Sequence, residues 1–300
     1  MAYTMTADIS RMILAGQKEI FTKNFDPYPV EYTQFSTPKT STKQTETYDS
    51  MGNLASGGEK QEGGPISYGK VQQAYQTEVK NKTWANGYEI TLEATKYDLY
   101  GVTKSVKAKE LARTMRELEE QRVIKRYDEA LTTNLADGVP LASNSKPLAN
   151  ASGLTNDTLA TASTLTDPAN HKSMIKMFAN FMNHQGGKMK SYPNLGMTNI
   201  QNQLDIEEIY GSDNVAGEIS NTKNVIKGKI RWVYSTYLAS TTAWMMIDTK
   251  YEHVIMQRFM DTVFDADEDK ISTKNMYLNA IAIYETGTLP NIGIVYNEGA

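Results

Sequence analysis

The chain has 300 residues, 40% of them hydrophobic, which is enough for one large or two smaller domains with a real core. It contains no cysteine, so disulfides and thiolate metal sites are excluded. A formal net charge of −4 argues against a protein that condenses nucleic acid through its overall charge. Any affinity for DNA therefore has to be local.

Residues 1–26 predict one short amphipathic helix, which ends at Asp26-Pro27. The N-terminus lacks a basic region followed by a sustained apolar region, so no secretory signal is expected. No apolar run approaches the ~20 residues needed to cross a bilayer, so no membrane partner is predicted.

Residues 44–80 predict a long hairpin. Its arms are polar extended segments, and residues 51–69 between them hold six glycines and a proline, which is typical of a flexible loop tip. Such a hairpin has no core of its own and needs a surface, either on the same subunit or on a neighbour. The alternative is a disordered insertion.

The longest helical segment runs from Lys107 to Leu135 without proline or glycine. At 1.5 Å per residue it would be on the order of 40 Å long, which favours an elongated subunit. Its apolar residues form two sets on roughly opposite sides: Leu111, Met115 and Leu118, then Ile124, Tyr127 and Leu131. We expect two successive packing partners, both in the same subunit or one in a neighbour.

Other segments alternate between strand and helix patterns, which predicts an α+β fold. Residues 88–93 alternate as a half-buried strand, and a second unit begins with a helix at Asp167-Pro168. Within that unit, residues 243–248 predict a buried strand and residues 251–260 a strand or short helix. Residues 276–284 and 292–296 are expected to pair with each other beside the long helix.

The sequence shows no motif for catalysis or for cofactor binding. His171, His184 and His253 are far apart and match no metal-binding spacing. Asp265, Asp267 and Asp269 alternate like the start of a calcium loop, but Lys270 stands where that loop needs glycine. We predict no catalytic, cofactor-binding or metal-binding residue, and a hydrolytic enzyme remains a remote alternative.

Two stretches resemble a known family. Residues 83–91, TWANGYEIT, with Glu93 and the DLYG that follows at 98–101, are similar to the segment before the spine helix of tailed-bacteriophage major capsid proteins, especially Mu-like head subunits. Residues 233–238, VYSTYL, and residues 243–248, AWMMID, resemble a later stretch of the same family. The order and spacing of elements agree across nearly the whole chain.

The resemblance implies the Hong Kong 97-like fold. Residues 1–43 would be an N-terminal arm, 44–82 the E-loop, 83–150 plus 275–300 a peripheral domain with its spine helix at 107–135, and 151–274 an axial domain. The E-loop tip would contact neighbouring subunits through Gly57, Gly58, Glu59, Lys60, Gly63, Gly64 and Pro65.

The resemblance also implies a structural function. Pentamers and hexamers would close into an icosahedral shell around double-stranded DNA, assembled in the host bacterial cytoplasm and located in the virion. Expected partners are the chain itself, a portal protein, a decoration protein and packaged DNA through non-specific contacts. Since few residues precede the E-loop and Met1 is present, we expect a separate scaffolding protein. An encapsulin-like compartment that encloses enzymes is the alternative.

Some shells of this family carry an isopeptide bond from an E-loop lysine to a neighbour's asparagine. Lys60 and Lys70 are the candidate lysines, and Asn279, Asn291 and Asn297 the candidate asparagines. The reaction needs a buried glutamate as base, which no spacing here identifies. We therefore predict no cross-link.

Overall fold

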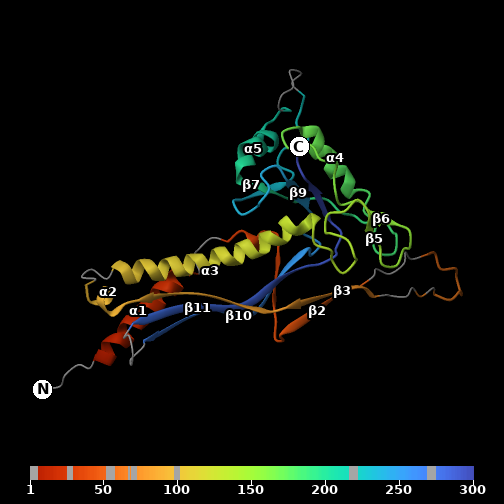
Figure 1. Ribbon diagram of the computed structural model, residues 1–300. Helices are drawn as coiled ribbons and strands as arrows, with labels where there is room; N and C mark the ends of the chain where they lie inside the picture. Colours follow the sequence, from red (N-terminus) through yellow and green to blue (C-terminus); the bar gives the residue numbers. More distant parts are fainter. Residues whose placement is uncertain are drawn as a thin grey trace.

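The computed structural model describes residues 6–25, 30–51, 58–66, 68, 73–97, 102–215, 222–268 and 275–300. The molecule is elongated, as Figure 1 shows. A long sheet with helices along it forms the lower body, and a second unit stands on that body near one end. The hairpin extends outward below the second unit, toward the right of the view.

The spine is helix α3, Val102–Asp128, continued by a 3-10 turn at Glu129–Leu131. The helix is 27 residues long. It begins five residues before the predicted start at Lys107 and ends before the predicted end at Leu135, so both predicted bounds are wrong. The helix ends early because β-branched Thr132 and Thr133 follow the turn and Asn134 forms a bridge with Pro140. The absence of proline and glycine from residues 107–135 was therefore not enough to locate the C-terminal end of the helix.

Helix α1, Thr6–Phe25, packs beside α3. Its last turns bury Phe21 and Phe25, whose rings stack with centroids 5.4 Å apart. The Arg116 guanidinium of α3 lies 3.8 Å from the Phe25 ring centroid, and its Nε donates to the Phe25 carbonyl at 2.9 Å. A short helix α2, Leu92–Tyr97, precedes α3, and a 3-10 turn, Tyr32–Gln34, follows α1.

The first sheet has four strands in the order β1-β10-β11-β4. They are β1 Thr37–Thr40, β10 Val254–Glu268, β11 Met276–Thr288 and β4 Lys82–Ile90. Strand β1 is parallel to β10, while β10, β11 and β4 are antiparallel neighbours. Alternate residues of β11 are buried from Met276 to Tyr284, and α3 packs against the sheet on that side.

The second sheet has the order β12-β9-β7-β8. Its strands are β7 Leu195–Asn199, β8 Arg231–Ser235, β9 Trp244–Ile247 and β12 Ile294–Asn297. Helices α4 Pro168–Phe178 and α5 Gln203–Gly211 lie on it, and a 3-10 turn, Ile200–Asn202, leads into α5. A short pair, β5 Lys146–Pro147 and β6 Thr155–Asn156, lies beside this unit.

Strand β9 is buried on both faces, which explains its continuous apolar sequence. Met245 and Ile247 belong to the core shared with α3 and the first sheet. Trp244 and Met246 belong to the core under α4 and α5. The prediction of a buried strand at 243–248 is confirmed.

One predicted pairing is wrong. Residues 276–284 do not pair with 292–296, because β11 pairs with β10 and β4 while β12 pairs with β9 in the second sheet. Strand β10, which falls within the predicted axial range 151–274, is a central strand of the first sheet. The partners β4 and β9 lie far along the chain from β11 and β12, and local residue patterns do not specify such partners.

The hairpin consists of β2 Thr45–Met51 and β3 Gln73–Lys80, paired antiparallel. Its base rests on the subunit's own body, because Val79 packs with Ile255 and Leu289 in a small core that Tyr48 partly covers. The Tyr48 hydroxyl also donates to Gln257 Oε1 at 2.9 Å. The surface that the hairpin needs is thus supplied, at its base, by the same chain.

Candidate functional site

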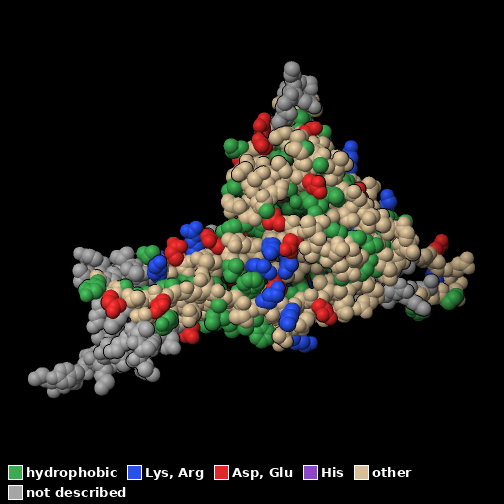
Figure 2. All heavy atoms as spheres, viewed as in Figure 1, with side chains coloured by type: hydrophobic (Ala, Val, Ile, Leu, Met, Phe, Trp, Pro, Cys, Tyr) green, Lys and Arg blue, Asp and Glu red, His purple; other side chains and the backbone are tan. Residues whose placement is uncertain are grey.

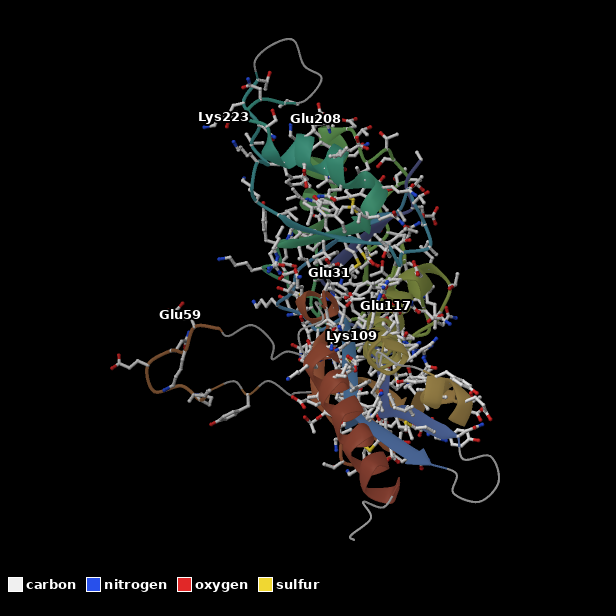
Figure 3. The ribbon with its side chains drawn as sticks, turned by 90° about the vertical axis from the view of Figure 1, so that its left-hand side faces the viewer. Glu31, Glu59, Lys109, Glu117, Glu208 and Lys223 are labelled. Atoms are coloured by element: carbon white, nitrogen blue, oxygen red, sulfur yellow. The ribbon has the colours of Figure 1, made fainter. Side chains whose placement is uncertain are left out.

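The hairpin tip projects away from the body, as Figure 3 shows for Glu59. Gly58, Glu59, Lys60, Gly63 and Pro65 are exposed, and Gly64 is half-buried. Gly63 has a φ of +76°, a conformation that favours glycine, and the Gly64 amide donates to the Gln61 carbonyl at 3.0 Å. Gly57 and Lys70 lie outside the described residues.

Two large apolar side chains near the tip were missed by sequence reasoning. Tyr68 is 87% exposed and Ile66 is 59% exposed, because the body of the subunit covers neither side chain. Exposed apolar side chains on a projecting element are typical of a contact surface. Their position beside the glycines was the signal that could have identified them.

A cleft of about 680 Å³ separates the hairpin base from the second unit. Its lining includes Lys188, Lys190 and Lys250 from the second unit and Asp49 and Ser50 from β2. The Ser50 hydroxyl donates to Asn291 Oδ1 at 3.3 Å. His184 also lines the cleft, and its Nδ1 accepts from the Ala149 amide at 3.5 Å.

Along the spine, the predicted packing residues differ in burial. Leu111, Met115, Ile124 and Tyr127 are buried, whereas Leu118 and Leu131 are half-buried. Ala108, Ala112, Val123 and Ala130 are buried as well, so the buried face turns gradually and does not switch to the opposite side. The described spine packs against three parts of this chain, namely α1 and the two sheets.

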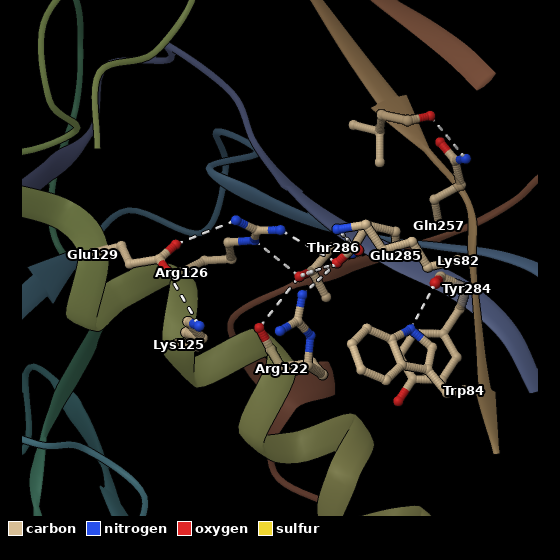
Figure 4. A network of polar contacts seen from close by, with 11 residues as sticks. Lys82, Trp84, Arg122, Lys125, Arg126, Glu129, Gln257, Tyr284, Glu285 and Thr286 are labelled. Carbon is tan, nitrogen blue, oxygen red and sulfur yellow. Dashed lines mark hydrogen bonds and ion pairs between the residues drawn. The ribbon is translucent and has the colours of Figure 1, made fainter. Parts of the chain in front are cut away.

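The C-terminal half of α3 is fixed to the first sheet by a charged network, drawn in Figure 4. Glu285 of β11 is only 5% exposed and meets three cations. Its carboxylate oxygens lie 2.9 Å from Arg122 Nη2, 3.2 Å from Arg126 Nη2 and 2.8 Å from Lys82 Nζ. Figure 2 shows lysine and arginine side chains gathered below this half of the helix.

Burial by itself would raise the pKa of Glu285, but bonds from Lys82, Arg122 and the Thr286 amide outweigh it and lower the pKa to about 2. The carboxylate is therefore ionised at neutral pH. Arg122 also lies 4.4 Å from the Trp84 ring centroid of β4. Three elements, β4, α3 and β11, thus meet at one buried charge, and the i,i+4 spacing of two arginines was the only sequence signal for it.

A second buried carboxylate fixes the middle of the spine. Glu119 is 1% exposed, and its oxygens lie 3.0 Å from Arg116 Nη1 and 3.0 Å from Arg258 Nη2 of β10. It also accepts a hydrogen bond from the Tyr32 hydroxyl at 3.1 Å. The spine is therefore attached to the sheet by two buried carboxylates, one carried by each element.

The three histidines are buried in separate places and have structural contacts. His171 stacks on Trp244 with centroids 4.4 Å apart, and its Nε2 lies 2.6 Å from the Leu165 carbonyl. Burial lowers its pKa to about 4, and burial has the same effect on His253. Asp265 lies in strand β10 and not in a loop, and Asp269 is outside the described residues.

A fully buried pair, Lys146 and Asp137, joins the short strand β5 to the turn after the spine, with Nζ and Oδ2 2.9 Å apart. Burial lowers the pKa of Lys146, and the neighbouring carboxylate opposes that effect. Within the described ranges, no group of three acidic or histidine side chains could hold a metal ion. No helix in those ranges is long and apolar enough to cross a membrane.

Comparisons with known proteins agree with this architecture. The model of a family described as phage capsid protein matches residues 74–286. No curated protein matches the sequence. The virus-like particle from Pyrococcus furiosus has a similar fold, with a TM-score of 0.58 over 94% of this chain and 97% of that chain at 11% identity.

Two phage capsid structures also have a fold similar to that of this chain. The capsid protein of cyanophage P-SCSP1u matches with a TM-score of 0.56, covering 91% of this chain and 88% of that chain at 11% identity. The mature capsid of bacteriophage PhiM1 matches with a TM-score of 0.56, covering 90% and 87% at 11% identity. At such low identity these likenesses show the fold alone.

The family match covers most of the chain, from the returning arm of the hairpin through the spine to β11. The elongated α+β architecture agrees with the expected Hong Kong 97-like fold. The specific resemblance to Mu-like head subunits stays a prediction. This chain belongs to the phage capsid protein family, has the Hong Kong 97-like fold, and is a structural capsid subunit.

Proposed function

We propose that this chain assembles with copies of itself, as pentamers and hexamers, into a closed icosahedral shell around double-stranded DNA. The observation that carries the proposal is the family match over residues 74–286 on a subunit with a projecting hairpin. In this proposal the hairpin tip is a contact between subunits and not part of the subunit core. Its exposed Ile66 and Tyr68 support that role, because burial against a neighbour would remove their apolar surface from water.

In this proposal each of the two sheets forms the centre of one domain of the subunit. The first sheet with α1, α2 and α3 is the peripheral domain, and the second sheet with α4 and α5 is the axial domain. In this division β10 falls in the peripheral domain and β12 in the axial domain, which differs from the ranges 151–274 and 275–300 predicted from the sequence. Residues 1–43 are the N-terminal arm in this proposal, and within it α1 packs along the spine while β1 adds a strand to the first sheet.

The partners beyond the chain itself are a separate scaffolding protein, a portal protein, a decoration protein and the packaged DNA. Assembly takes place in the host cytoplasm, and the mature protein resides in the virion. The shell has no enzymatic activity in this proposal, because buried charged groups such as Glu285 and Lys146 are already paired within the fold.

An encapsulin-like compartment is the second candidate, since the Pyrococcus furiosus virus-like particle shares the fold. The family match favours the phage shell. Genes beside the coding sequence distinguish the two: terminase, portal and tail genes accompany a phage shell, and a cargo enzyme accompanies a compartment.

Size-exclusion chromatography with light scattering tests the proposal. Expressed with its scaffolding protein, the chain should elute as particles of megadalton mass, far above the 33.5 kDa of one chain. A monodisperse monomer under these conditions would contradict the proposal.

A further inference from the structure

Helix α5 carries an acidic outer face. Asp205, Glu207 and Glu208 are exposed, while Ile206 and Ile209 point into the core. Leu204, on the same outer face, is 77% exposed. The Glu207 carboxylate accepts a hydrogen bond from the neutral Gln203 side chain at 2.7 Å, and among the described residues no lysine or arginine forms an ion pair with these three carboxylates. This face therefore combines uncompensated negative charge with exposed apolar surface.

Helix α4 carries a basic outer face. Lys172 and Lys176 are one turn apart and point away from the buried side chains of Met174 and Phe178. Neither lysine has a carboxylate within 4 Å among the described residues. Nearby Ile175 and Met177 are half-buried and extend the surface with apolar atoms.

The two faces lie on opposite sides of the second unit. In Figure 1, α5 is at the left edge of that unit and α4 at the right edge. Figure 2 shows acidic side chains at the first edge and lysine or arginine side chains at the second. Figure 3, turned by 90°, looks onto the α5 side, with Glu208 toward the viewer and α4 behind.

We propose that the α5 face of one copy docks against the α4 face of the next copy. This inference rests on the proposed shell function and names the contact that closes its rings. A contact between two different patches on opposite sides is heterologous, and repeating it generates a ring when the successive rotations close. Two α5 faces, or two α4 faces, repel each other, and this excludes a two-fold contact at the same place.

The charges also set the register of the contact. Asp205 and Glu208 are three residues apart, and Lys172 and Lys176 are four apart, so each pair lies on neighbouring turns of its helix. Two antiparallel or crossed helices can therefore bring both pairs together at once. Leu204, beside the carboxylates, loses its exposed surface against the half-buried apolar side chains of α4.

Charge reversal with rescue tests the proposal. One variant carries Lys172→Glu and Lys176→Glu, a second carries Asp205→Lys and Glu208→Lys, and a third combines all four changes. Because these side chains lie outside the core, each variant should fold with a wild-type Tm as an unassembled subunit. The measured quantity is the fraction of protein that sediments as closed particles.

Each single-face variant should lose at least about tenfold in particle yield, because like charges then meet across the contact. The combined variant should return to near the wild-type yield, because the charges are complementary again. A control pair, Lys107→Glu and Lys109→Glu on the exposed side of the spine, makes the same change in net charge as the α4 variant and should assemble.

Wild-type yield in either single-face variant, or no recovery in the combined variant, would overturn this interface and leave the shell function standing. An equal loss in the control pair would also overturn it, since net charge alone would then explain the effect. Failure of the wild-type chain to form particles would overturn the proposed function and the interface with it.

Discussion

Glu285 shows how one side chain can fix the position of a whole helix. Three cations from two elements surround its buried carboxylate, so removing the charge takes away the carboxylate that Lys82 and Arg122 share, while Arg126 keeps Glu129. Breaking a buried ion pair from one side costs far more than deleting an exposed pair. Neutralising Glu285 should therefore lower the free energy of unfolding much more than neutralising a glutamate of an exposed ion pair.

Glu285→Gln should lower the free energy of unfolding by on the order of 3 kcal/mol. The matched control is Glu19→Gln, which removes a carboxylate 2.6 Å from Lys23 on α1. Both side chains of that pair are more than half exposed, so its loss should leave the free energy of unfolding nearly unchanged. Urea unfolding of the unassembled subunit measures both values, and equal losses would contradict the role assigned to Glu285.

Acid should destabilise the subunit in two windows. The pKa of His171 is lowered from 6.5 to about 4, so below pH 6.5 the unfolded chain binds a proton that the folded chain excludes. Stability therefore falls between pH 6.5 and 4, by up to about 3 kcal/mol from this residue. The pKa of Glu285 is lowered to about 2, so its contribution is present above pH 4.5 and is lost between pH 4.5 and 2.

His171→Gln tests the first window, because glutamine keeps hydrogen-bonding groups but does not titrate. The slope of unfolding free energy against pH between 6.5 and 4 should become shallower, while His253 preserves part of it. An unchanged slope would show that His171 is not the source of the acid sensitivity.

At the scale of elements, the spine packs unevenly along its length. Met115 is fully buried against α1 and the core, whereas Leu118 is half-buried. Met115→Ala should cost about 2–5 kcal/mol, since it leaves a cavity. Leu118→Ala should cost about 1 kcal/mol, because solvent already reaches the site. Thermal unfolding distinguishes the two variants, and a larger loss at Leu118 than at Met115 would contradict this uneven packing.

The hairpin should matter for the shell and not for the subunit. Deleting residues 57–64 and joining the arms removes only the tip, because the base is fixed by Val79 and by Tyr48 bonded to Gln257. The subunit should keep its Tm, while shells become fewer or less heat-stable. Normal shells of unchanged thermal stability would contradict the tip's role as a contact between subunits.

The sequence was most informative where local pattern decides structure. The spine, the buried strand at 244–247 and the hairpin arms all follow from residue periodicity or composition. Partners distant in the chain were not predictable, as β10 and β12 show, because a strand's pattern gives its faces but not its neighbour. The Glu285 network was missed for the same reason, since it joins residues more than 150 positions apart.

At the scale of the whole molecule, the shell should be held without covalent links. Asn297 is 1% exposed and both polar atoms of its amide are bonded within the chain, to residues 161, 163 and 299. Asn291 also bonds to Ser50. Mature particles boiled in detergent should give one gel band near 33.5 kDa. A ladder of pentamer and hexamer bands would contradict this and implicate Lys60 or Lys70 first.

The central claim is that copies of this elongated subunit build a closed shell. Three surfaces have no complete partner in the described chain: the hairpin tip, the outer face of α4 and the outer face of α5. Their proposed functions as contacts depend on that claim. Negative-stain electron microscopy of the purified protein, produced with its scaffolding protein, tests it most directly. We predict closed isometric particles tens of nanometres across, whereas a field of single elongated subunits would contradict the account.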